Sequence, residues 1–228
     1  MKIKALLFDF DGLILDTETP EFHVWQAIYR DHGHELAAES WGQIVGGWGA
    51  SQFDAAEHLV ELAGDGLNAD TLRARHKSES DALTLRQPVM PGVMDYLGDA
   101  RRLGLHLAVA SSSPHSWVDT HLARLGLADR FDVIICSDDV PPRRTKPHPD
   151  LFLKALDVLG VKADEAIVFE DSPNGVNAAR AAGGFVVSVP NPVTALLKTE
   201  GADLSLESLA DMPLQDLLDL VDNSFVVK

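Results

Sequence analysis

Five short, largely apolar runs, each ending abruptly in polar residues, place the strongest limit on how this chain can fold. They cover residues 3–10, 105–110, 131–136, 166–169 and 185–189. Continuous apolar runs of this length, rich in β-branched residues, are typical of strands buried on both faces of a sheet. Because such strands occur in sheets that helices cover on both sides, the runs predict a parallel sheet.

Helical patterns separate these runs. Apolar or small side chains recur at helical spacing in residues 117–125, 151–159 and 174–182. The residues that follow these segments are Gly126, Gly160 and Gly183. Glycine there favours the left-handed conformation that closes a helix. Strands that alternate with helices predict an α/β fold, with a doubly wound parallel sheet in a Rossmann-like core.

Residues 17–88 break this rhythm. The segment has helical periodicity, for example between Phe22 and Ile28, and contains no clear buried strand. A stretch of about 70 residues between consecutive strands is far longer than an ordinary crossover connection. We therefore expect an all-helical cap domain at 17–88, inserted into a core that comprises 1–16 and 89–228. The alternative is that these helices simply pack on one face of the sheet.

Polar residues suited to catalysis follow several predicted strands. In chain order they are Asp9 and Asp11, then Ser111, Ser112 and Ser113, then Lys146, and finally Glu170 and Asp171. Ligands of open parallel sheets bind outside the carboxyl ends of the strands, so these side chains are expected to converge. Each one alone is also a common turn former or helix cap, and only their combination indicates a site.

The acidic members of this set predict a metal site. Four carboxylates buried near one another would be costly unless a cation compensated for their charge. Oxygen ligands favour a hard divalent ion, and Mg²⁺ takes a few protein oxygens together with water and substrate phosphate. A carboxylate beside such a metal can attack phosphorus and form an acyl phosphate. The pattern therefore indicates phosphoryl transfer with Mg²⁺ as the cofactor.

Four motifs occur in order at residues 9–17 (DFDGLILDT), 109–113 (VASSS), 146–152 (KPHPDLF) and 169–175 (FEDSPNG). They resemble the four motifs of the haloacid dehalogenase superfamily. Within it, the chain is similar to the subfamily of β-phosphoglucomutases and small-sugar or nucleotide phosphatases that carry a helical cap after the first strand. The resemblance extends over essentially the whole chain.

The resemblance implies roles for the acidic residues. Asp9 matches the nucleophile that becomes an aspartyl-phosphate, and Asp11 matches the general acid that later serves as base for the attacking water. Asp171 matches a magnesium ligand, beside the Asp9 carboxylate and the Asp11 backbone carbonyl, and Glu170 matches the acidic position next to it. The superfamily's metal-free dehalogenases lack an acid at the position of Asp11, so carbon–halogen cleavage is not expected.

The resemblance also implies groups that bind the substrate phosphate. Ser111 and Lys146 match the residues that hold phosphate in the superfamily. The backbone N–H groups of Gly12 and Ser112 are expected to bind phosphate oxygens as well. Gly12 additionally allows the chain to turn sharply after the first strand.

The chain departs from the mutases of the subfamily where a second phosphate would bind. Those mutases have a histidine five residues after the aspartate that matches Asp16, and basic residues in a glycine-containing cap loop. Here the histidine position is Glu21, and the loop at 41–50 has no lysine or arginine. An acidic residue repels a second phosphate. We therefore expect a phosphatase for a sugar phosphate, a nucleoside monophosphate such as that of pseudouridine, or phosphoglycolate, with a β-phosphoglucomutase as the alternative.

Two sets of residues in the predicted cap each have two possible roles, and the cap as a whole is expected to move. Glu18 and Glu21 either face the site or are ordinary solvated charges on a helix. Trp48 either contacts an uncharged part of the substrate or packs the cap against the core. The cap is expected to open and close about hinges near residues 14–17 and 87–92, so that closure excludes water from the reaction.

A phospho-aspartate signalling receiver is the alternative from a different class, because receivers also place paired acids, a hydroxyl and a lysine on a doubly wound sheet. They carry the phosphorylated aspartate after the third strand. Here the third predicted strand is followed only by Ser137, Asp138 and Asp139. The order of the motifs therefore favours an enzyme.

Composition limits the partners and the compartment. The net charge of −16 argues against nucleic-acid polymers and anionic membranes, which bind basic surfaces. The single cysteine, Cys136, permits no intramolecular disulfide. Apolar runs fall short of the roughly 18 residues of a membrane span. We expect a cytoplasmic monomer whose partner is a small phosphorylated substrate.

Overall fold

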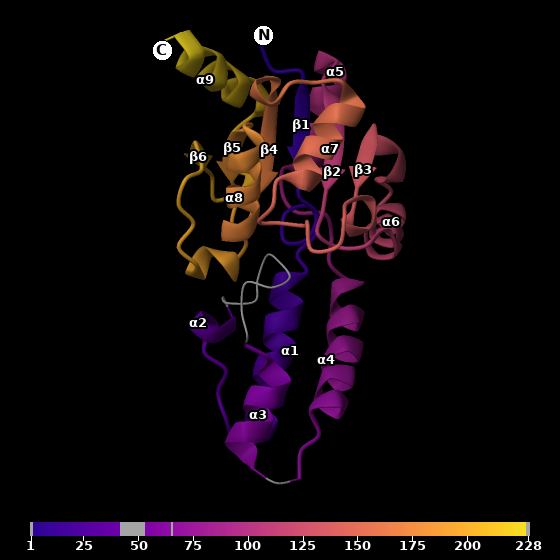
Figure 1. Cartoon of the computed structure of the whole chain (residues 1–228), viewed down its shortest axis with the longest axis vertical. Coiled ribbons are helices and arrows are strands. Elements are labelled where there is room, and N and C mark those ends of the chain that lie inside the picture. The colour runs from indigo at the N-terminus through magenta and orange to yellow at the C-terminus, as the bar shows by residue number, and fades with distance from the viewer. Residues whose placement is uncertain (1, 42–52, 65, 227–228) are drawn as a thin grey trace.

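A computed structural model describes residues 2–41, 53–64 and 66–226. Figure 1 shows a core that contains the sheet and, at one end of it, a group of helices. In the described residues six strands form one parallel sheet in the order β3-β2-β1-β4-β5-β6. They are β1 (Ala5–Phe8), β2 (His106–Ala110), β3 (Val133–Ile135), β4 (Ala166–Glu170), β5 (Phe185–Ser188) and β6 (Leu204–Ser205). The predicted α/β fold with a doubly wound parallel sheet is confirmed.

The observed strands are mostly shorter than the apolar runs that predicted them. The first run extends over residues 3–10, but β1 covers Ala5–Phe8. The chain nevertheless stays extended just beyond the carboxyl end of β1, where the Asp9 N–H donates to the Phe169 carbonyl at 3.0 Å. The edge strand β6 was not predicted, because two residues are too few to show a pattern of burial.

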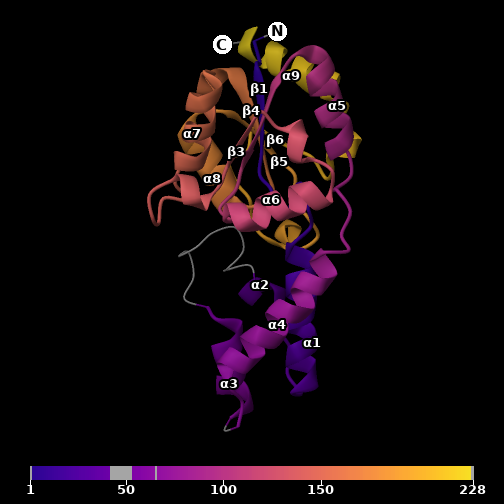
Figure 2. The same ribbon diagram turned by 90° about the vertical axis from the view of Figure 1, so that its right-hand side faces the viewer.

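Helices cover both faces of the sheet, as Figure 2 shows with the sheet seen nearly edge-on. On one side lie α5 (Val93–Leu103), α6 (His115–Arg124) and α9 (Leu214–Val226), and on the other lie α7 (Asp150–Leu159) and α8 (Pro173–Ala182). Successive residues of β1 pack against opposite helix layers. Leu6 and Phe8 belong to the apolar cluster with α5, α6 and α9, and Leu7 belongs to the cluster with α7 and α8. Both faces of the central strands are therefore buried, which accounts for their continuous apolar sequence.

The second group of helices comprises α1 (Glu18–Asp31), α2 (Ala38–Trp41), α3 (Ala55–Ala63) and α4 (Ala69–Thr84). Its apolar cluster includes Trp25, Ile28, Tyr29 and Leu59 and is distinct from the two clusters on the sheet. The Tyr29 hydroxyl donates to the Ala55 carbonyl at 2.8 Å and ties α1 to α3. Across the described residues, no helix has the length and apolarity needed to cross a bilayer.

Two chain segments connect this helical group to the core, and they run side by side. Leu15 forms bridges with both Asp11 and Val89, and the Met90 N–H donates to the Ile14 carbonyl at 2.9 Å. From the core, the Arg124 guanidinium donates to the Gln87 carbonyl at 3.1 Å. These contacts hold the helical group over the carboxyl end of β1, next to the groups that the sequence singled out.

Candidate active site

A buried ion cluster lies at the carboxyl ends of β1 and β4. The Lys146 ammonium contacts the Asp9 carboxylate directly and forms an ion pair with Glu170 at 2.6 Å. All three side chains are almost fully buried. Burial alone would lower the pKa of Lys146, but the two carboxylates raise it above its usual value, so the lysine is a cation. The sequence positions 9, 146 and 170 thus meet at one point.

Asp171 joins this cluster from the residue after β4. Ligand oxygens of Asp9, Glu170 and Asp171 lie within 4.8 Å of one another, the arrangement among the described residues that would suit a metal ion. Burial, and then the charges of Asp9 and Glu170, raise the pKa of Asp171 well above its usual range. Burial likewise raises the pKa of Asp9 to about 8, although Lys146 opposes the shift.

The charge balance of this cluster shows what it lacks. Three carboxylates share one lysine, so the fully ionised cluster would carry two uncompensated negative charges. Buried charges without partners are strongly unfavourable. A hard divalent cation supplies the missing charge and prefers carboxylate oxygens. The residues present therefore fit the predicted magnesium ion.

Asp11 is held by three donors from the segment that follows β2. The Trp117 indole N–H donates to its Oδ1 at 2.8 Å, and the hydroxyls of Ser113 and Ser111 donate to Oδ2 at 2.7 and 3.2 Å. The Ser111 hydroxyl also accepts from the Ser113 N–H at 3.0 Å. Ser112 lines the pocket beside them, and no hydrogen-bond partner for its buried hydroxyl oxygen occurs in the part of the chain that the structure describes.

Gly12 packs against the acidic cluster more closely than a side chain would allow. It has a φ of +84°, and a Cβ atom at this position would fall 2.3 Å from Asp171 Oδ2. The same atom would lie 2.6 Å from the Asn191 amide nitrogen. Glycine is therefore required for two reasons, the left-handed turn that was expected and the close approach of Asp171, which was not.

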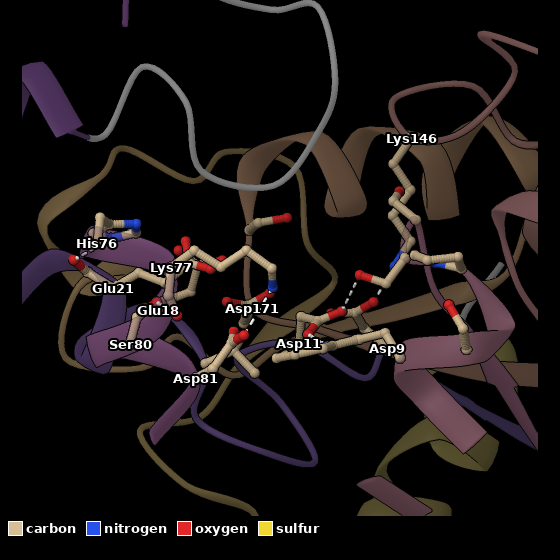
Figure 3. A pocket seen from close by; sticks show the side chains of 17 residues that line it. Asp9, Asp11, Glu18, Glu21, His76, Lys77, Ser80, Asp81, Lys146 and Asp171 are labelled. Atoms are coloured by element: carbon tan, nitrogen blue, oxygen red, sulfur yellow. Dashed lines mark hydrogen bonds and ion pairs between the residues drawn. The ribbon is translucent and has the colours of Figure 1, made fainter. Parts of the chain in front are cut away.

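A pocket of about 740 Å³ opens over these groups, between the core and the helical group. Its core side includes Asp9, Asp11 and Lys146, and Figure 3 shows these side chains directed towards one end of it. The opposite wall comes from α1 and α4 and carries Glu18, Glu21, His76, Lys77, Ser80 and Asp81. The pocket is large enough for a small metabolite.

The wall formed by α1 and α4 is acidic. Burial, and then the charge of Asp11, raise the pKa of Glu21 to about 7, and burial and the charge of Glu21 raise the pKa of Glu18 well above its usual range. Lys77 lies on the same wall but forms an ion pair with Asp81 at 2.8 Å. Of the two interpretations of Glu18 and Glu21, the one in which they face the pocket is correct.

The predicted site residues thus converge, with two differences in detail. Asp9, Asp11, Ser112, Lys146 and Asp171 line the pocket, and Glu170 lies buried behind them. The Ser111 hydroxyl, expected to hold phosphate, hydrogen-bonds to Asp11 and the Ser113 N–H in this structure. The Gly12 N–H, also expected to bind phosphate, donates to the Leu15 carbonyl at 2.7 Å. The predicted loop at 41–50, with Trp48, lies outside the described residues except for Trp41, which is buried in the helical group.

Sequence reasoning missed Trp117, Asn191 and the pocket residues of α4. Trp117 fitted the apolar pattern of its helix, so nothing in the pattern marked its indole N–H as a donor to Asp11. Asn191 comes soon after β5 and donates to Asp171 Oδ2 at 2.8 Å. The rule that sites form beyond strand ends, applied to the fifth strand as well, would have found it.

Comparison with known proteins identifies what this arrangement resembles. The family model of the haloacid dehalogenase-like hydrolases matches residues 3–183. The chain is 46% identical to the Bacillus subtilis (strain 168) protein "Putative phosphatase YhcW" over 217 residues, which cover 95% of this chain and 97% of the relative. It is 32% identical to the fructose-1-phosphate phosphatase YqaB of Escherichia coli (strain K12) over 185 residues, with 81% of this chain and 95% of YqaB covered.

Solved structures agree with these matches. A family hydrolase from Deinococcus radiodurans R1, crystallised with bound phosphate and sodium, superposes with a TM-score of 0.77. Its sequence is 25% identical, and the match covers 97% of each chain. The similarity therefore includes both the sheet core and most of the helical group that forms the other wall of the pocket.

Proposed function

Because the chain belongs to the haloacid dehalogenase-like hydrolases, in their phosphatase branch, we propose that it hydrolyses the phosphomonoester of a small phosphorylated metabolite. The observation that carries this proposal is the buried cluster of Asp9, Lys146, Glu170 and Asp171 at the base of a metabolite-sized pocket. Such a cluster offers a nucleophile, a fixed cation and a metal site within a few ångströms. A sugar phosphate or a nucleoside monophosphate is the substrate class that we expect.

In the proposed first step, an Asp9 carboxylate oxygen attacks phosphorus. The Asp9 oxygen–phosphorus bond forms, the bond from phosphorus to the leaving oxygen breaks, and Asp11 gives its proton to that oxygen. Lys146 and the backbone N–H group of Ser112 would bind the phosphate oxygens, whereas the Gly12 N–H donates to the Leu15 carbonyl. To take its predicted role beside them, the Ser111 hydroxyl would turn its donor from Asp11 to a phosphate oxygen. The product alcohol then leaves Asp9 as an aspartyl-phosphate.

In the proposed second step, Asp11 acts as a base. It removes a proton from a water molecule, the water oxygen bonds to phosphorus, and the bond between phosphorus and the Asp9 oxygen breaks. Inorganic phosphate is released, and Asp9 returns to its carboxylate form. Each step restores the proton that the other one uses, so Asp11 serves as acid and base in turn.

Asp9, Asp171 and the Asp11 carbonyl would hold the magnesium ion, with Glu170 as a further ligand or a partner of those ligands. When bound, Mg²⁺ supplies positive charge that reduces the repulsion between the Asp9 carboxylate and the phosphate. Lys146 adds a second, permanent positive charge from the protein side. The chain's own contribution is to keep three carboxylates together in spite of their repulsion.

The acidic wall of the pocket favours hydrolysis over phosphoryl transfer between two positions of a sugar. A mutase must bind a bisphosphate, with its second phosphate near the cap. Glu18 and Glu21 lie on that wall, and carboxylates repel a dianion but accept hydrogen bonds from hydroxyls. We therefore propose a leaving group that is uncharged and rich in hydroxyls, rather than the substrate of a β-phosphoglucomutase.

The receiver alternative finds no support at the end of β3. Asp138 accepts from the His115 N–H at 2.7 Å, and Asp139 accepts from the Cys136 N–H at 2.9 Å. Asp138 thus accepts from the first residue of α6, Asp139 stabilises the turn after β3, and neither lines the pocket.

We also propose that residues 17–88 act as a cap that opens and closes about the paired connections near 14–17 and 87–92. The pocket lies between these helices and the core, so a movement of one relative to the other would change how far the pocket is open to solvent. A disulfide that locked the two parts together and left turnover unchanged would contradict this part of the proposal.

The test of the proposed function is a steady-state assay of phosphate release from p-nitrophenyl phosphate and from a panel of phosphorylated metabolites. We expect many turnovers per molecule with Mg²⁺, loss of activity with a chelator, and loss of at least about 10³-fold in Asp9→Asn. Asp138→Asn, outside the pocket, is the matched control. Activity that persists in Asp9→Asn, or faster isomerisation than hydrolysis of β-glucose 1-phosphate, would refute the proposal.

A further inference from the structure

The segment that follows β5 lies at the end of the core that faces the helical group (Figure 1), and Asn191 belongs to this segment. The side chain is 2% exposed. Its amide nitrogen donates to Asp171 Oδ2 at 2.8 Å and lies 3.5 Å from the Gly12 carbonyl oxygen. One buried donor thus contacts the carboxylate and the backbone turn on two sides of the acidic cluster.

The turn around Asn191 fixes this amide from its other end. Asn191 Oδ1 accepts from the N–H groups of Val193 at 2.9 Å and Thr194 at 3.0 Å. The Asn191 N–H in turn donates to the Thr194 hydroxyl at 2.9 Å. Because two backbone donors need the oxygen, the nitrogen of the amide must face Asp171. The orientation of the side chain is therefore determined by its surroundings.

From these contacts we infer that Asn191 is a positioning residue, which holds the Asp171 carboxylate where it can bind the metal ion of the proposed phosphatase. The inference rests on the proposed function. Asp171 is buried next to Asp9 and Glu170, whose charges repel it. The hydrogen bond from Asn191 keeps one oxygen of Asp171 in place and leaves the other available to a cation. Groups that orient metal ligands in this way commonly determine metal affinity.

The position of the turn strengthens this inference. Val193, two residues after Asn191, is buried in the apolar cluster of the helical group together with Phe22 and Trp25. In this arrangement the segment that carries Asn191 contacts the core through Asp171 and the helical group through Val193.

The experiment measures Mg²⁺ binding to the metal-free protein by isothermal titration calorimetry, so that its readout does not depend on activity. Asn191→Ala removes the donor to Asp171 and the acceptor of the turn. Asn191→Ser removes the amide N–H that reaches Asp171, but its shorter hydroxyl can still accept from the backbone of the turn. Thr194→Ala weakens the turn without changing the donor. Unfolding temperatures are measured in parallel for all three variants.

We expect Asn191→Ala and Asn191→Ser to bind Mg²⁺ at least about tenfold more weakly than the wild type, and Thr194→Ala to stay within about twofold. Turnover of the two Asn191 variants should recover largely at saturating Mg²⁺. Equal affinities in all variants, or losses that follow the unfolding temperature and include Thr194→Ala, would overturn the inference. Weaker Mg²⁺ binding by the Asn191 variants of a protein that hydrolyses no phosphomonoester would support the role of Asn191 in positioning Asp171 and refute the proposed function.

Discussion

The two walls of the pocket are both acidic, but their charges are organised differently. On the core wall, the buried Lys146 contacts Asp9 and Glu170 together, and Asp171 completes the group. On the wall formed by α1 and α4 (the cap wall), Lys77 pairs with Asp81 and is itself largely exposed. Among the described residues, Glu18 and Glu21 have no ion pair, and residues 42–52 contain no lysine or arginine that could provide one.

This difference separates two tasks. In the proposed reaction, the core wall supplies a fixed cation, a place for a metal ion and a nucleophile, which any phosphomonoester would use in the same way. The cap wall has carboxylates that line the same pocket, Glu18 and Glu21, where we propose that they select against a negatively charged leaving group. We therefore expect substitutions in the core to affect all substrates alike, and substitutions in the cap to change which substrate is preferred.

The largest expected difference between the walls concerns their lysines. Lys146→Met removes a buried cation and leaves Asp9 and Glu170 facing each other, so we expect a loss of about 3–5 kcal/mol in unfolding free energy. Lys77→Met removes an exposed partner of Asp81, and we expect a loss below about 1 kcal/mol. Denaturant unfolding of the two metal-free variants measures both. Similar losses would show that the core cluster is not the tightly coupled unit described above.

Selectivity should depend on the cap wall. Glu21→Lys replaces a repulsive charge with an attractive one, so the ratio of kcat/KM for a hexose bisphosphate to that for the matching monophosphate should rise by about tenfold, or about 1.4 kcal/mol. Glu61→Lys makes the same charge change on the exposed face of α3 and should leave the ratio unchanged. A ratio that rises equally in both variants would attribute the effect to overall charge rather than to the pocket wall.

The pKa of Glu21 makes a further prediction about stability. Burial, and then the Asp11 and Asp81 charges, raise it to about 7, so the folded protein binds a proton that the unfolded chain has already lost above its ordinary carboxyl pKa. Stability therefore decreases as the pH rises towards and through about 7. Glu21→Gln should exceed wild type in unfolding free energy by on the order of 1 kcal/mol near pH 8 and match it near pH 5. Equal pH profiles in denaturant unfolding would contradict the burial of this charge.

The sequence alone predicts the site residues of the core wall better than those of the cap wall. Strand ends in the core are recognisable, because several buried apolar runs stop close to a polar side chain of the site, as at Asp9 and Asp171. The cap has no such marker. His76 and Lys77 lie on a helix whose pattern shows which face is apolar, but not that its polar face meets a site built from the other end of the chain.

Contacts between distant residues limited the prediction within the core as well. Asp11 and Trp117 are 106 positions apart, and a tryptophan at helical spacing is predicted correctly as a packing residue without any hint of its hydrogen bond. The boundaries of the cap at 17–88 and the roles of the site residues stay predictions.

Trp117 should have the smallest effect of those considered. Trp117→Phe removes the indole donor to Asp11 and keeps a ring against His121. Ser113 and Ser111 still hold the other oxygen of Asp11, so we expect kcat/KM to decrease by only about threefold, near the lower limit for one hydrogen bond. If Trp117 acts through Asp11, the substitution should cost nothing further in an Asp11→Asn background, since the two residues form one unit. A threefold loss that persists in that background would instead make Trp117 part of the substrate-binding wall.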